Sequence, residues 1–260
     1  MLEDDFTYVF RKSLTGCGLS ATAAAKRAEI QECDALSLLH GTFSAETARK
    51  LAPVLGLNAD AFARHAFYEP EPMAVPGIDR LDLPFGGERV NAWIIRSGGS
   101  ILLFDAGYLA MDLLDSLNAV CGRLPDRVFI THAHRDHVGG VTSLREAGLP
   151  VHAANIPGTI PMNPGDSVFC GPLCITACDL SGHAMPALGF HIEGLSTPVL
   201  VTGDALFAGS MGGCSSPAIY QHALVRLRET LAPLTDSTVL LPGHGPATTI
   251  GQERGANPFL

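Results

Sequence analysis

The chain has 260 residues, of which 47% are hydrophobic and 17% charged. This composition excludes an intrinsically disordered protein, which would combine low hydrophobicity with high charge. A formal net charge of −9 disfavours nucleic acid and anionic membranes as partners, and no apolar run approaches the ~18 residues that a membrane span requires. The first residues, Met1 to Phe6, lack a basic segment followed by an apolar one, so we expect a cytoplasmic protein.

Residues 1–70 are predicted to form a small all-α domain. An alanine-rich stretch from Ala21 to Ala28 favours a helix, and Ser44 and Asn58 can cap two further helices over 45–55 and 59–67. The stretch 18–57 resembles the helix-turn-helix domain of Cro/C1-type repressors. In that family the third helix contacts the DNA major groove, and the resemblance implies that residues 31–40 would take this place.

The charge of this helical domain disfavours DNA binding. Residues 1–70 contain 7 lysines and arginines and 9 aspartates and glutamates, which gives a net charge of −2. The helix that would contact DNA opens with Glu32, Cys33 and Asp34, and carboxylates at that edge would repel phosphates. We therefore expect a packing or dimerisation module, through which the chain could form a homo-oligomer.

Residues 71–260 are predicted to form a larger α/β domain. Prolines at 70, 72 and 76 indicate a linker over 68–77, because proline moves the preceding residue out of helical geometry. Apolar runs at 90–96 and 101–104, separated by two glycines, predict a β-hairpin. Helices are expected near 110–121, 139–147 and 217–231. Strands that alternate with helices indicate an α/β fold.

The stretch 128–140 carries the most informative side chains of the chain. An apolar run ends in three histidines and an aspartate within six residues: His132, His134, Asp136 and His137. An extended backbone would place the first two imidazoles on the same side, and the turn that follows would present the other two groups nearby. Neutral imidazoles and carboxylates are the donors that bind pairs of divalent cations. Three more candidates follow, two of them directly after apolar runs: His183, Asp204 and His244.

With this order of ligands, residues 73–260 resemble the metallo-β-lactamase superfamily, which is marked by His-x-His-x-Asp-His and a later His, Asp and His. The resemblance implies an αββα sandwich with two metals at the shared edge of its sheets. It assigns His132, His134 and His183 to one metal and Asp136, His137 and His244 to the other, with Asp204 bridging them. Asp105 resembles the family's supporting aspartate and would orient the ligand loop. The nitrogen-rich set favours zinc, although iron and manganese accept the same donors.

These ligands predict metal-assisted hydrolysis of an ester, thioester or amide. Water between two cations has its pKa lowered from 15.7 towards ~7, and Asp136 would orient it and move a proton. The segments 203–210 and 242–260 resemble compact bacterial glyoxalase II enzymes, which hydrolyse S-lactoylglutathione and similar thioesters. That resemblance implies a small-molecule substrate. Residues 71–260 contain no lysine, so Arg135 and Arg254 are the candidates for contact with an anionic substrate.

Two other functions remain open from the sequence. Persulfide dioxygenases resemble the same family and use one iron held by two histidines and one aspartate, so metal content would separate them from a hydrolase. A regulator in which residues 1–70 bind DNA and the metal domain senses a ligand is the other alternative.

The remaining histidines and the cysteines receive structural interpretations. We read His40, His65, His152, His191 and His222 as surface or core residues, and alternation turns His191 away from the face of its apolar neighbours. Seven cysteines, an odd number, are expected to be reduced thiols. Cys170, Cys174 and Cys178 recur every four residues, but a turn at Gly171 and Pro172 favours burial over a thiol metal site.

Overall fold

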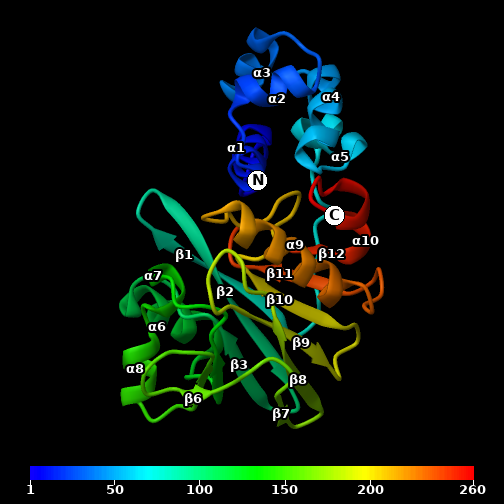
Figure 1. Ribbon diagram of the computed structural model, residues 1–260. Coiled ribbons are helices and arrows are strands. Elements are labelled where there is room, and N and C mark those ends of the chain that lie inside the picture. Colours follow the sequence, from blue (N-terminus) through cyan, green and yellow to red (C-terminus); the bar gives the residue numbers. More distant parts are fainter.

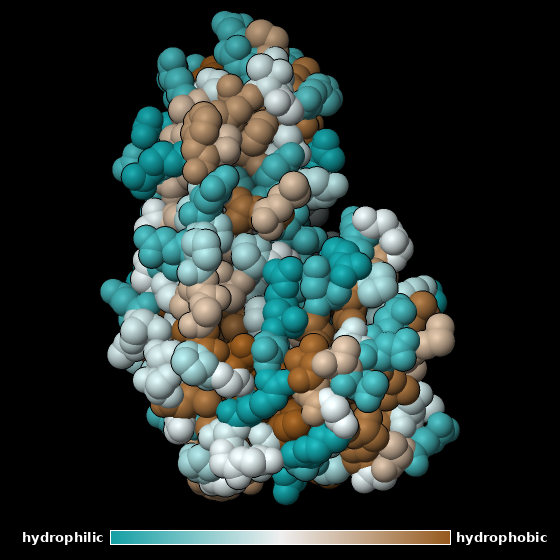
Figure 2. All heavy atoms as spheres, turned by 180° about the vertical axis from the view of Figure 1, so that it is seen from behind, coloured by the Kyte–Doolittle hydropathy of each residue, from teal (hydrophilic) through white to brown (hydrophobic).

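The computed structural model describes residues 1–260 as two six-stranded sheets packed face to face, with helices on both outer faces and a helical segment at the N-terminus (Figure 1). Seen from behind, the helical segment forms a narrower lobe on one end of the broader sandwich (Figure 2). No helix has both the length and the apolar character that crossing a membrane would demand.

The N-terminal lobe consists of short helices, each begun by a capping side chain or an extended residue. Asp5, Ser20, Ser44 and Asn58 accept hydrogen bonds from the first backbone amides of four of these helices, which confirms the two predicted caps. The elements are α1 (Phe6–Cys17), α2 (Ala21–Arg27), α3 (Glu32–Leu39), α4 (Ala45–Leu55), α5 (Ala59–Arg64) and the 3-10 turn η1 (His65–Phe67).

The first sheet begins with an antiparallel meander and continues with parallel strands. Its order is β1 (Ile78–Phe85), β2 (Glu88–Ser97), β3 (Ser100–Phe104), β4 (Arg127–Phe129), β5 (Val151–Ala153) and β6 (Ile160–Pro161). The predicted hairpin is confirmed as β2 and β3. The helices α6 (Ala110–Cys121), α7 (Arg135–Val138) and α8 (Val141–Glu146) cover the outer face of this sheet (Figure 1).

The second sheet is antiparallel except for one pair of strands. Its order is β12 (Thr248–Thr249), β11 (Val239–Pro242), β10 (Val199–Gly203), β9 (Leu188–Glu193), β8 (Leu173–Asp179) and β7 (Ser167–Cys170). β10 and β11 are parallel, so their carboxyl ends meet at one edge. The remaining helices are α9 (Pro217–Leu231), which lies over this sheet, and α10 (Ile250–Ala256).

Alternation along the strands divides the apolar side chains among three layers. On β2, Trp93 and Ile95 point between the sheets, whereas Ile94 points outward to α6 and α8. On β10, Val201 faces the inter-sheet core and Leu200 faces α9. A sheet covered on both faces needs apolar residues at successive positions, which explains the continuous apolar runs in the sequence. The α/β sandwich is confirmed.

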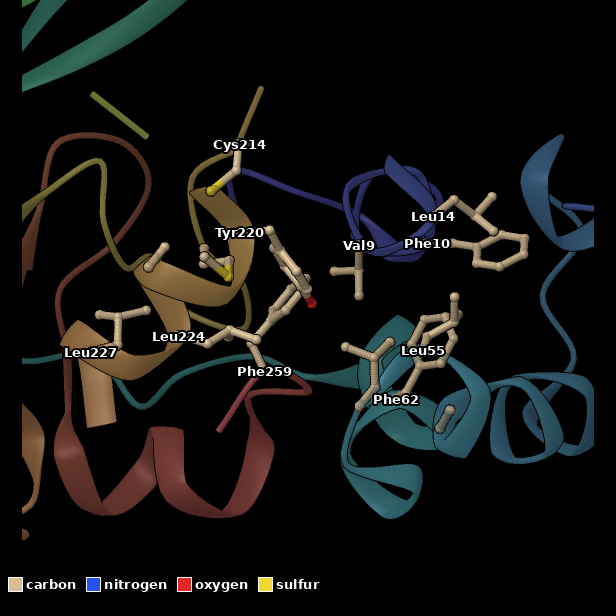
Figure 3. Close-up of a cluster of buried hydrophobic side chains, with 14 of the residues drawn as sticks. Val9, Phe10, Leu14, Leu55, Phe62, Cys214, Tyr220, Leu224, Leu227 and Phe259 are labelled. Atoms are coloured by element: carbon tan, nitrogen blue, oxygen red, sulfur yellow. The ribbon is translucent and has the colours of Figure 1, made fainter. Parts of the chain in front are cut away.

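The N-terminal helices share their hydrophobic core with the outer face of the second sheet. One cluster of 28 buried residues includes Val9 and Phe10 of α1 together with Tyr220 and Leu224 of α9 (Figure 3). The contact between the two helices is close, because a Cβ placed on Gly16 would lie 2.4 Å from Tyr220 Cγ. The helical lobe is therefore packed directly onto the sandwich.

One local prediction is confirmed and another needs correction. The helix predicted near 139–147 is confirmed as α8, and Gly139 and Gly140 separate it from the short helix α7. Gly139 lies so close to the loop after β3 that a Cβ there would come 2.0 Å from Tyr108 O. The apolar run before His132 is strand only through Phe129, so the first two histidines lie in a loop rather than on a strand.

Candidate metal centre

The seven predicted ligand side chains converge at one edge of the sandwich. They come from the loops that follow β4, β8, β10 and β11, and from α7, which continues the first of these loops. Because these loops leave the sheets at the same edge, residues distant in sequence become neighbours. They are His132, His134, Asp136, His137, His183, Asp204 and His244.

These seven residues form two groups of four that share Asp204. One group is His132, His134, His183 and Asp204, and the other is Asp136, His137, Asp204 and His244; within each, the donor atoms lie within 4.8 Å of one another. This is the same division that the family resemblance implies.

The separations between donor atoms suit common cations. Asp204 Oδ2 lies 3.5 Å from His183 Nε2 and 3.5 Å from His244 Nε2. The Oδ1 atom of the same carboxylate lies 3.4 Å from His137 Nε2. Two ligands at tetrahedral angles with metal bonds of 2.0–2.2 Å would be about 3.3–3.6 Å apart. The Asp204 oxygens thus lie at these distances from histidine nitrogens of both groups, as expected for a carboxylate that binds both cations.

Four imidazoles are oriented by contacts to their Nδ1 atoms. His183 donates to Gly213 O at 2.9 Å, and His244 donates to Arg89 O at 2.7 Å. His137 Nδ1 lies 2.8 Å from Asp105 Oδ2, and His132 Nδ1 lies 2.9 Å from Thr131 Oγ1. In a neutral ring, a hydrogen on Nδ1 leaves the Nε2 lone pair free to bind a metal, and these contacts turn Nε2 of each ring towards the centre of the cluster.

Asp105 contacts the ligand loop and one of the clustered histidines, as expected for the supporting aspartate of the family. Its carboxylate contacts His137 and accepts hydrogen bonds from the backbone amide of Thr131, at 2.8 Å, and from the Thr131 hydroxyl. Asp105 has a φ of 62°, which is uncommon outside glycine and costs roughly 1–3 kcal/mol. The surrounding hydrogen bonds hold it in that conformation, so it links the ends of β3 and β4 to the cluster.

Glycines allow the backbone to approach the ligands closely. A Cβ on Gly243 would lie 2.1 Å from Asp204 Oδ1 and 2.7 Å from His137 Cε1. A Cβ on Gly212 would lie 2.0 Å from the Asp204 carbonyl and 2.8 Å from the His183 ring. Any side chain at these positions would displace a ligand.

The residues that hold the last ligand loop were not predicted from the sequence. Asn91 on β2 donates to Pro242 O and Gly245 O, both at 2.9 Å, and Trp93 Nε1 donates to Pro242 O at 2.8 Å. Together they hold the loop that carries His244. The one available signal was a buried amide inside the apolar run of β2, which requires partners somewhere in the fold.

Burial lowers the pKa values of histidines in the cluster, whereas neighbouring carboxylates raise them. Burial, reinforced by His137, lowers the pKa of His132 to about 2, and burial also lowers the pKa of His183. For His244, burial is outweighed by the Asp136 hydrogen bond and by Asp204, which raise its pKa to about 9.

Burial alone would raise the pKa values of both cluster carboxylates. The charge of the neighbouring His137 instead holds the pKa of Asp204 far below its usual range, and a hydrogen bond from His244 lowers the pKa of Asp136. Both are therefore ionised at neutral pH.

The unpartnered atoms of the cluster fit a positively charged occupant. His132 Nε2, His137 Nε2 and Asp204 Oδ1 are buried and have no hydrogen-bond partner. Leaving such atoms unpaired is costly, and cations would satisfy all three. The donor set of imidazoles and carboxylates matches that of divalent metals.

The two arginines predicted to contact substrate lie in different environments. Arg135 is exposed beside Asp136, and its guanidinium lies 5.4 Å from the Tyr108 ring centroid. Arg254 pairs with Asp236 and donates to Leu231 O at 3.2 Å, at the end of α9. Its guanidinium thus joins α10 to α9, and the substrate contact of Arg254 stays a prediction.

The histidines outside the cluster lie in structural positions. His152 is buried and stacks on Phe129 with ring centroids 5.0 Å apart, and His65 Nε2 donates a hydrogen bond of 2.9 Å to Gly209 O. His191 is less buried than its neighbours Phe190 and Ile192, as alternation predicted. No cysteine belongs to either candidate metal group, and the turn after Cys170 separates it from the other two on β8.

A cavity of about 960 Å³ lies outside this cluster. It is lined by the first residues of the chain, by the linker around 65–78 and by parts of β2 and β11, and it contains none of the seven clustered side chains. The groups able to bind metal therefore lie at the histidine cluster and not in this cavity.

Comparison with known proteins identifies the family. The sequence profile of the metallo-beta-lactamase superfamily matches residues 85–170, which contain four of the seven clustered side chains. Hydroxyacylglutathione hydrolase GloC of Haemophilus influenzae is 31% identical over 160 residues, covering 51% of this chain and 74% of that protein. The chain belongs to the metallo-β-lactamase superfamily.

Two further similarities extend over more of the chain. The probable metallo-hydrolase YqgX of Bacillus subtilis (strain 168) is 26% identical over 204 residues, covering 68% of this chain and 95% of that protein. The crystal structure of TTHA1623 in a di-iron-bound form is similar with a TM-score of 0.54 and 30% identity, covering 69% of this chain and all of that one. Within this superfamily the clustered histidines and aspartates form a possible di-metal site.

Proposed function

We propose that this protein is a dinuclear metal-dependent hydrolase that acts on a thioester or related ester. The observation that carries the proposal is the pair of four-donor groups that share Asp204. Two similarities support it: GloC is named as a hydroxyacylglutathione hydrolase, and TTHA1623 has been crystallised with two irons.

The residues of the two groups would each hold one cation, and Asp204 would contact both. Zinc suits the excess of nitrogen donors, and iron and manganese are the alternatives to be measured. When bound, such a cation pair supplies Lewis acidity and lowers the pKa of coordinated water towards ~7.

Asp136 is the side chain that we assign to proton handling. Its Oδ2 atom lies 3.2 Å from His244 Nε2 and 3.5 Å from His137 Nε2, and its side chain is 10% exposed. Its lowered pKa keeps the carboxylate ionised at neutral pH. Asp136 would orient water for attack on the acyl carbon and take up its proton, which then passes to the departing thiolate, giving an acid and a thiol.

The surface around the cluster supports a small anionic substrate. Residues 71–260 contain no lysine, and the exposed guanidinium of Arg135 follows directly on the ligand loop. A glutathione thioester carries carboxylates that arginine can bind. We therefore assign substrate contact to Arg135.

Elemental analysis of the purified chain, together with hydrolysis of S-lactoylglutathione, a lactone and a β-lactam, tests the proposal. We expect about two metal ions per chain and preferential thioester cleavage. Asp204→Ala should lose metal and turnover together, by more than the roughly 100-fold that loss of a supporting residue costs. His222→Ala, which removes an imidazole outside the cluster, is the matched control and should retain both.

Other results would point to other functions. One iron per chain, with oxygen uptake on glutathione persulfide, would favour a mononuclear dioxygenase. A gel shift that weakens with added salt would favour a DNA-associated regulator. Full thioesterase activity in Asp204→Ala would contradict the shared role of that carboxylate.

A further inference from the structure

The N-terminal helix brings a lysine to the edge of the metal cluster. Lys12 on α1 is the only lysine near residues 205–214, and its side chain is 18% exposed. The ammonium group pairs with Asp4, donates to Met211 O at 3.0 Å and lies 5.2 Å from the Phe207 ring centroid. Residues 71–260 contain no lysine, and the loop beside the cluster is thus contacted by a lysine from residues 1–70.

A second contact from the same segment holds the neighbouring residue of that loop. Asp4 is buried, and its Oδ2 atom accepts a hydrogen bond of 2.5 Å from the hydroxyl of Ser210, which is fully buried. Lys12 and Asp4 therefore fix two successive positions, Ser210 and Met211, across about 200 residues of sequence.

The loop continues from these contacts directly to the cluster. Gly212 lies against the Asp204 carbonyl and the His183 ring, where a Cβ would come within 2.0 and 2.8 Å. The next carbonyl, Gly213 O, accepts the hydrogen bond from His183 Nδ1. Three consecutive residues, 211–213, thus connect Lys12 to the orientation of a candidate metal ligand.

The two glycines explain why the loop needs an external support. Glycine has the greatest backbone freedom of any residue, and neither Gly212 nor Gly213 has a side chain that could hold the loop in place. The backbone position of Gly213 O depends on what holds the residues before it. On that side the structure provides the Lys12 ammonium and the Asp4 carboxylate.

The helix that carries Lys12 is itself firmly placed. Val9 points towards Tyr220 of α9 within the shared core, and Gly16 lies against the same ring (Figure 3). Asp5 caps the start of α1, one residue after Asp4. The position of the ammonium group is thus determined by packing and not by the loop that it contacts.

We propose that Lys12, together with Asp4, is a positioning residue for His183: it holds Met211–Gly213 so that Gly213 O fixes the orientation and tautomer of the imidazole. The N-terminal helical segment is then a working part of the metal centre. This inference rests on the proposed function for its consequence, the binding of metal by His132, His134 and His183. The orientation of the ring is a property of the metal-free protein and can be measured separately.

The test uses the full chain with Lys12→Met, which keeps the length of the side chain and removes its charge and hydrogen bonds. Lys50→Met is the matched control, because Lys50 forms an exposed pair with Glu46 on α4. In metal-free protein labelled with ¹⁵N-histidine, we expect His183, assigned with His183→Ala, to be the Nδ1–H tautomer in wild type and control and a mixture in Lys12→Met.

Metal binding gives the second readout. In chelator competition with Zn²⁺, Lys12→Met should weaken one of two sites by about 10–100-fold, the range for residues that orient metal-bound histidines, and leave the other unchanged. The visible spectrum of the Co²⁺ form should change with that site. Asp4→Asn should also weaken Zn²⁺ binding at one site. If Lys12→Met does not fold, the measurements on Asp4→Asn test the inference instead.

The inference is overturned if both variants keep the wild-type tautomer of His183 and bind both metals within twofold of Lys50→Met. Wild-type protein that binds no metal would instead refute the proposed function. In that case the tautomer measurement alone still decides whether Lys12 positions His183.

Discussion

Replacing Gly243 with alanine places a methyl group at the point where both candidate metal groups meet. Its Cβ would lie 2.1 Å from Asp204 Oδ1 and 2.7 Å from His137 Cε1, whereas real Cβ contacts are no shorter than 3.0 Å. The carboxylate oxygen must therefore move by at least 0.9 Å. Metal–ligand distances tolerate only about 0.2 Å, so the shared ligand would leave its position.

The expected consequences differ for metal binding and for stability. Zn²⁺ affinity should fall by at least the roughly 10–100-fold seen for loss of residues that orient ligands, and turnover should fall with it. Overpacking costs about 1–3 kcal/mol, which corresponds to a fall in Tm of roughly 2–12 °C for the metal-free chain. The variant should therefore fold and fail to bind.

Chelator-competition titration with elemental analysis measures the first effect, and thermal unfolding of the metal-free protein measures the second. Gly255→Ala is the matched control, because nothing lies within 4 Å of a Cβ at that position in α10. If Gly243→Ala binds two metals as tightly as Gly255→Ala, the close approach of this loop to Asp204 has no role in metal binding.

Two further substitutions test the supports of the fold. Asp105→Asn removes the charge beside His137 and should weaken metal binding by about 10–100-fold in the same titration; unchanged affinity would contradict the supporting role. Asp5→Ala removes the cap of α1, which should cost about 1 kcal/mol in urea unfolding at pH 7. Burial alone would raise the pKa of Asp5, but hydrogen bonds from Thr7 and Tyr8 lower it below its value in the unfolded chain, which is ~3.9. The ionised cap therefore stabilises the folded protein fully above the unfolded pKa, and this stabilisation is lost as the pH falls through the folded pKa. The difference between wild type and Asp5→Ala should therefore shrink at pH 3, and an equal difference at both pH values would refute this cause.

The elements that could be predicted from sequence are those with strong local signals. The hairpin of β2 and β3 follows from two apolar runs around a glycine turn, and α9 follows from the capping Ser216 and the regular spacing of Leu224 and Leu227. The clustered histidines and aspartates were found because their residue types and order are unusual. Residue type and order can be read from the sequence without knowing the path of the backbone.

Apart from Asp105, which the family resemblance implied, the supports of the cluster were not predictable, because they depend on contacts between distant residues. Gly213 and Arg89 orient two imidazoles through backbone carbonyls, which any residue type would supply. Asn91 acts on Pro242, across a separation of 151 residues. β1 has a proline and alternating charges, a pattern that is ambiguous until β2 pairs with it.

Because residues 71–260 contain no lysine, only arginines were predicted as cations for the catalytic part, on the assumption that a function stays within the segment that carries its motif. Lys12 shows how packing changes that conclusion, since α1 lies on α9 and directs its ammonium group into the loop beside His183. The same core of 28 buried residues contains side chains from both sides of residue 70. A helix packed in this way transmits any displacement of the lobe to the loop at 211–213, and therefore to the histidine that this loop orients. Because residues 1–70 have a net charge of −2 and expose carboxylates at Glu32 and Asp34, we propose that this segment serves the internal role and does not contact phosphates.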